Sequence, residues 1–130
     1  MATFRRFEEI SAWQKARQLT RLVYQVSGEG TFAKDFGLRN QVRRAAVSIM
    51  ANIAEGHGRH SDKEFANYLN IAHASVAETQ SHLYVALDPG YIDEPVFSNL
   101  YNLLDEVSRM TLSLARHLHG IKTLRDTFME

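Results

Sequence analysis

The segment that most restricts the fold is QVRRAAVSIMANIAEGHGR, residues 41–59, because its apolar side chains go almost all the way round a helix. Ala46, Val47, Ile49 and Ala51 cannot all lie on one narrow side at the helical period. A helix that faces water keeps one side polar, so this helix should be buried on most of its sides. The segment therefore predicts a helix enclosed by other helices.

A line of polar residues runs along the same helix. Its members are three or four positions apart and share one face, and polar groups on a buried helix need hydrogen-bond partners. Arginine suits this position because its planar fork pairs with a carboxylate. With two residues of the next helix, the predicted structural polar network comprises Arg44, Ser48, Asn52, Glu55, Ser75 and Glu78. A packing role is favoured over a catalytic or ligand site, since buried polar groups often specify helix register.

Start and stop signals divide the chain into four helices, at about residues 11–27, 36–56, 61–87 and 94–119. Ser11, Asp35 and Ser61 are the expected N-caps of the first three, and Ser61 with Glu64 forms a capping-box pattern. Proline is tolerated in a first turn, so the fourth helix should begin near Pro95. The helices should end at the glycines after residue 27, at Gly56, at the turn 88–90 and at Gly120.

Apolar residues of the fourth helix alternate at spacings of three and four, which is typical of a bundle seam. The fold class predicted for the 130 residues is a single all-α domain, an antiparallel four-helix bundle. A line of small residues on the third helix, from Ala66 to Ser81, would let another helix approach closely, either within the chain or from a second copy. The predicted core is Trp13, Val23, Val42, Ile49, Ile53, Leu69, Val76, Leu83, Leu100, Leu104, Val107 and Leu114.

Composition removes several function classes. Cysteine is absent, so disulfides and thiolate metal sites are excluded, as fits a reducing cytoplasm. The start has no apolar stretch of the kind found in a secretory signal. The longest weakly polar run, residues 45–54, is too short to span a bilayer, so no membrane partner is expected.

Charge is unevenly spread although the formal net charge is zero. Residues 11–54 contain seven basic and two acidic side chains, whereas residues 78–130 contain four basic and eight acidic ones. A basic surface is one interpretation; mutual attraction of the two halves within the bundle is another. The predicted nucleic-acid-binding residues are Lys15, Arg17, Arg21, Arg39, Arg43 and Arg59, with Arg39 and Arg43 foremost. No RNA-recognition, KH or helix-turn-helix signature accompanies them.

Other sites are weakly indicated. The loop 56–61 precedes a helix N-terminus and contains Arg59 and His60, so it is a candidate phosphate site as well as a simple turn. The six histidines lack the spacing of known metal motifs, and no metal or other cofactor is expected. No nucleophile motif is present, and Glu55 with His57 is the only acid–base pair of note. We therefore expect no catalytic residues and no enzyme activity.

Several stretches together resemble one known family. They are Trp13-Gln14-Lys15-Ala16, Leu38, Gln41, Arg43-Arg44-Ala45, Ser48-Ile49, Asn52-Ile53-Ala54-Glu55-Gly56, Arg59, Phe65, Leu69, Ile71-Ala72, Ser75, Glu78 and Gly90-Tyr91. The pattern is similar to the four-helix-bundle family encoded by intervening sequences of 23S ribosomal RNA genes, and it covers about residues 7–118. One departure is Ala33-Lys34-Asp35, where family members usually show a proline and then a glutamate.

The resemblance implies an up-down-up-down bundle that assembles as a homopentameric ring in the bacterial cytoplasm. It also implies relatedness to accessory proteins of diversity-generating retroelements, which bind a reverse transcriptase and nucleic acid through basic surfaces. Expected partners are therefore other copies of the chain, and RNA or a nucleic-acid-processing protein. The alternative function is a protein-binding or purely structural oligomeric scaffold.

Overall fold

The computed structural model describes residues 4–129, with side chains described through residue 118. Over this range the chain forms four α-helices and no strand, which confirms the all-α class. The helices are α1 (Ser11–Ser27), α2 (Phe36–His57), α3 (Asp62–Leu87) and α4 (Glu94–Met129). Short 3-10 turns, Phe7–Glu9 and Phe32–Lys34, precede α1 and α2.

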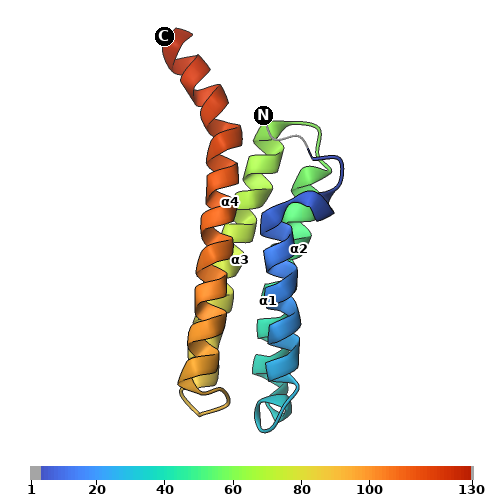
Figure 1. Cartoon of the computed structure of the whole chain (residues 1–130), viewed down its shortest axis with the longest axis vertical. Coiled ribbons are helices and arrows are strands. Elements are labelled where there is room, and N and C mark those ends of the chain that lie inside the picture. Colours follow the sequence, from blue (N-terminus) through green and yellow to red (C-terminus); the bar gives the residue numbers. More distant parts are fainter. Residues whose placement is uncertain (1–3, 130) are drawn as a thin grey trace.

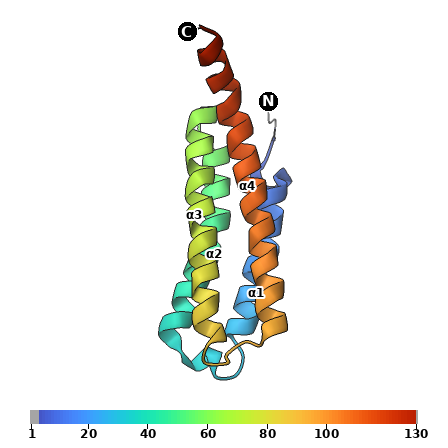
Figure 2. The ribbon, with the colours of Figure 1, turned by 90° about the vertical axis from the view of Figure 1, so that its left-hand side faces the viewer.

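The four helices lie side by side along one long axis, with consecutive helices running in opposite directions (Figures 1 and 2). Helix α1 packs on α2 and α4, and α3 packs on the same two helices. Two connections close the end of the bundle where α1 and α3 finish, and the α2–α3 loop lies at the other end (Figure 1). No helix of the described residues is long and apolar enough to cross a bilayer.

Side chains cap three of the helices where the sequence predicts a start. Asp35 accepts a hydrogen bond from the backbone N–H of Leu38 at 3.1 Å, and Ser61 accepts one from Glu64 at 3.1 Å. Asp93 caps α4 through the N–H of Val96 at 3.0 Å, with Pro95 in the first turn. Such caps satisfy N–H groups that have no partner within the helix.

One predicted N-cap and one predicted helix end are wrong. Ser11 is the first residue of α1, and the N-cap is Ile10, whose side chain is buried in the core and forms no capping bond. Helix α4 continues past Gly120 to Met129, beyond the bundle (Figure 1). A glycine inside a helix costs only about 1 kcal/mol relative to alanine, and no proline follows to stop the helix.

Ten of the twelve predicted core residues are buried, and Trp13 and Leu114 are half-buried against them. Two buried residues outside the predicted core, Ile10 and Phe32, close the ends of the bundle. Phe32 stacks on Tyr91, whose hydroxyl donates to Asp35 at 3.0 Å. Asp35 therefore caps α2 and also ties its start to the α3–α4 connection.

Candidate nucleic-acid interface

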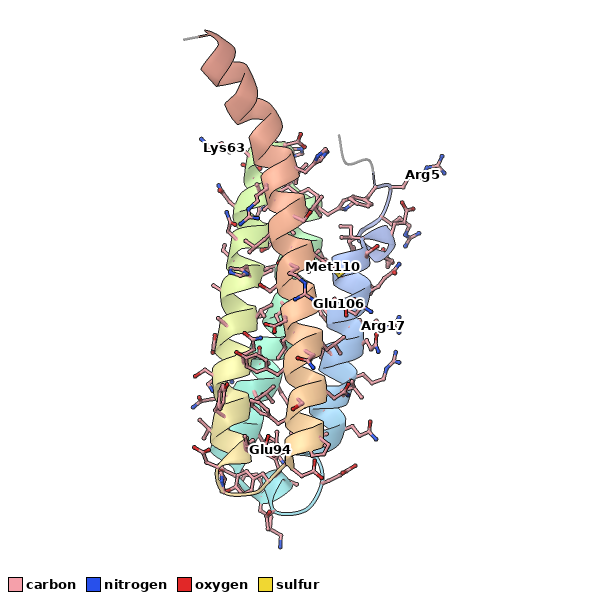
Figure 3. The ribbon with its side chains drawn as sticks, turned by 60° about the vertical axis from the view of Figure 1, so that its left-hand side comes forward. Arg5, Arg17, Lys63, Glu94, Glu106 and Met110 are labelled. Atoms are coloured by element: carbon pink, nitrogen blue, oxygen red, sulfur yellow. The ribbon has the colours of Figure 1, made fainter. Side chains whose placement is uncertain are left out.

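The outer face of α1 presents arginines that no carboxylate on the helix neutralises, because residues 11–27 contain neither Asp nor Glu. Trp13, Arg17, Arg21 and Tyr24 follow one another at spacings of four, four and three, which places them on one face. Arg17 and Arg21 are exposed, and they form no ion pair among the described residues. Figure 3 shows Arg17 projecting outward from α1, on the side away from Lys63.

The basic face continues from α1 onto α2 through Arg43. Its guanidinium lies over the ring of Tyr24, 4.5 Å from the centroid, and its Nη2 donates to the Tyr24 carbonyl at 3.2 Å. Its Nε donates to the Ser27 hydroxyl at 2.8 Å. Arg44 is exposed beside it, and both line one hollow with Tyr24. We call this set the basic strip; it comprises Trp13, Arg17, Arg21, Tyr24, Arg43 and Arg44.

Three predicted binding residues are partly occupied by contacts within the chain. Lys15 pairs with Glu106 of α4 at 3.4 Å. Arg39 donates from Nη1 to the Ala33 carbonyl at 3.0 Å, and its buried Nε has no hydrogen-bond partner among the described residues. Arg59 lies 3.6 Å from Glu55 and donates to the Tyr68 hydroxyl. These three side chains are therefore less available to a ligand than Arg17 and Arg21.

The predicted binding residues did not include the aromatic rings that lie beneath four of the arginines. The guanidinium groups of Arg17, Arg39, Arg43 and Arg59 lie 4.5–5.9 Å from the ring centroids of Trp13, Phe36, Tyr24 and Tyr68, respectively. The first two pairs are local, at i,i+4 and i,i+3, so helical spacing could have revealed them. The Tyr24 and Tyr68 pairs join different elements and needed the fold.

The polar line of α2 forms a smaller network than predicted within one chain. The hydroxyls of Ser48 and Ser75 are hydrogen-bonded at 2.9 Å, joining α2 to α3. Asn52 donates to the Ser48 carbonyl at 2.8 Å and to its hydroxyl at 3.0 Å. Arg44, Glu55 and Glu78 instead lie exposed, because their positions on the helices point away from the bundle core.

The histidines have different roles in the described structure. His57 donates from Nε2 to the Phe4 carbonyl at 2.8 Å, and His73 lies 2.8 Å from the Ser108 hydroxyl on α4. No group of three or more metal-binding side chains occurs among the described residues. A hollow of about 620 Å³ lies between the N-terminal segment and α4, near Arg109 and His117. None of the six predicted binding residues lines it.

Comparison with known proteins identifies a matching family and similar solved structures. The model of the family described as 23S rRNA-intervening sequence protein matches residues 8–113. A crystal structure of a protein of unknown function from the S23 ribosomal protein family of Bacteroides thetaiotaomicron VPI-5482 superposes with a TM-score of 0.73. It is 27% identical and covers 81% of this chain and 98% of its own. No curated protein matches.

Proposed function

Because the chain belongs to the 23S rRNA-intervening sequence protein family, we propose that it is a non-catalytic RNA-binding protein of the bacterial cytoplasm that uses the basic strip. The family description refers to the RNA gene and names no ligand, so the proposal depends on surface chemistry. The observation that carries it is the outer face of α1, which has exposed Arg17 and Arg21 and no acidic residue.

Arginines on such a face favour a polyanion. Guanidinium groups pair with phosphate oxygens in a forked geometry, and each contact releases condensed counterions from the nucleic acid. Arg44 extends the positive charge onto α2, where Glu55 is the first carboxylate along the helix. An assembly of several copies would repeat the basic strip and raise the total affinity through multivalency.

The test is RNA binding by charge-reversal variants at several salt concentrations. Arg17→Glu with Arg21→Glu changes two exposed residues, so helix content should remain intact. The matched control is Lys63→Glu with Arg116→Glu, which changes the net charge equally at exposed positions on α3 and α4. Loss of two phosphate contacts should lower the slope of log affinity against log salt by about 1.4 to 1.8.

We expect the wild type and the control to retard a hairpin RNA at low salt and the α1 variant to do so weakly. Equal binding by the α1 variant and the control would contradict the use of the basic strip. Arg39 and Arg43 are less suitable for this test, because both hold backbone carbonyls of other segments. Reversing them would disturb the fold as well as the surface.

A second function, an oligomeric scaffold without nucleic-acid binding, is favoured by apolar side chains on the outside of α2 and α3. Val47, Ile71 and Val85 are 41%, 49% and 52% exposed, and Ala74 and Ala77 lie exposed on α3. Apolar surface of this kind often marks a protein–protein contact. We propose that it joins copies into the homopentamer expected from the resemblance. A wild type that assembles but retards no RNA would leave this function in place of the first.

A further inference from the structure

A hollow of about 350 Å³ lies between α1 and α2 within the basic strip. Tyr24 lines it from α1, and Asn40, Arg43, Arg44 and Val47 line it from α2. Two arginines and an amide beside an aromatic ring make this hollow different from a simple charged surface. A site for a phosphate group alone would need only the two positive charges.

Arg43 uses much of its hydrogen-bonding edge within the protein. Nε and Nη2 are held by Ser27 and by the Tyr24 carbonyl, and the guanidinium is stacked over the Tyr24 ring. These bonds orient a flat cation and a flat aromatic ring together in the hollow. Tyr24 remains 45% exposed, so its ring is accessible to a ligand.

A second aromatic platform lies one helical turn away. Phe36 is 63% exposed, shares a face of α2 with Asn40 at i,i+4, and is stacked under Arg39 at 4.8 Å. The face of α2 that carries Asn40 therefore also carries an exposed ring, Phe36, next to the hollow that Tyr24 and Asn40 line. An amide side chain both donates and accepts hydrogen bonds, as the edges of unpaired bases require.

We infer that this hollow, together with the exposed Phe36 ring beside it, is a groove that takes the unpaired bases of single-stranded RNA, which stack on Tyr24 and Phe36 while Arg44 contacts the backbone. The inference rests on the proposed function and specifies the class of RNA. Bases in a duplex are paired and stacked on one another, so they offer these rings no free face. Unpaired bases have free faces that stack on aromatic rings and guanidinium planes with little sequence preference.

The test compares a short single-stranded RNA containing 2-aminopurine with a duplex RNA of the same length. Tyr24→Ala should weaken single-strand binding about 5- to 100-fold and duplex binding by much less. Tyr24→Phe keeps the ring and should keep the affinity. Binding should quench 2-aminopurine fluorescence in the wild type and in Tyr24→Phe, and less so in Tyr24→Ala.

Tyr84→Ala is the matched control, because Tyr84 is 49% exposed on α3, outside the basic strip. The Tyr24 variant retains the backbone carbonyl that holds Arg43, and its melting temperature checks that the fold is unchanged. Unaltered single-strand affinity in Tyr24→Ala, or equal losses for both RNAs, would overturn the inference while the proposed function stands. A wild type that binds neither RNA would refute the proposed function itself, and the inference with it.

Discussion

Gly56 allows the end of α2 to pack closely on the start of α3. A Cβ atom at this position would lie 2.7 Å from the Cβ of Tyr68 and 3.0 Å from Cδ1 of Phe65. The Tyr68 Cβ is attached directly to the backbone, so no rotamer change can relieve the contact. Gly56→Ala should therefore push the two helices apart.

Two effects of opposite sign decide how much Gly56→Ala changes the free energy of unfolding. Overpacking a tight contact destabilises by about 1–3 kcal/mol. Alanine in place of glycine in a helix stabilises by up to about 1 kcal/mol. We expect Gly56→Ala to lower the free energy of unfolding by roughly 0–3 kcal/mol.

Gly37→Ala is the matched control on the same helix. A Cβ at Gly37 would meet only Asp35 Oδ1, at 3.9 Å, an ordinary van der Waals distance. This variant should be neutral or stabilised by up to about 1 kcal/mol. Urea unfolding of the two variants at one protein concentration measures the difference, expected at about 1–3 kcal/mol. If Gly56→Ala is as stable as Gly37→Ala, the close approach of α2 and α3 is wrong.

Three further predictions concern the core, the base of the bundle and assembly. Ile49→Asp places a charge at a fully buried position and should destabilise by several kcal/mol; a soluble variant with unchanged melting temperature would contradict that placement. The hydrogen bond to Asp35, and secondarily burial, raises the pKa of Tyr91 above its ordinary value of 10.0. The neutral hydroxyl is thus favoured in the folded state. Its contribution to the free energy of unfolding is complete below pH 10.0 and should be lost as pH rises through the folded pKa. Unfolding midpoints measured across this range should fall less in Tyr91→Phe than in the wild type. Light scattering should give a mass several times that of one chain, and a monomer mass at every concentration would exclude the oligomer.

Local sequence rules determined most of the fold. Asp35, Ser61 and Pro95 mark helix starts through bonds or steric limits that reach no further than four residues, and the structure begins α2, α3 and α4 within one residue of the predicted positions. The apolar periodicity of α4 likewise identified its buried face. The apolar residues around α2 predicted burial on most of its sides, but within one chain Val47 and Ala51 lie exposed. Ser11 was wrongly expected to be an N-cap, because the buried Ile10 takes that position. Gly120 was wrongly expected to end α4, because a helix tolerates a single glycine.

The tertiary structure alone decided which side chains of the site meet. Arg43 is bonded to Ser27, 16 residues earlier, and Ser48 to Ser75, 27 residues later. Arg44 and Arg43 are adjacent in sequence, yet one is exposed and the other is held against α1. Spacing assigns a residue to a face of its own helix, but it does not say which element covers that face. The groove at Tyr24 therefore exists only because α1 and α2 pack with these two faces together.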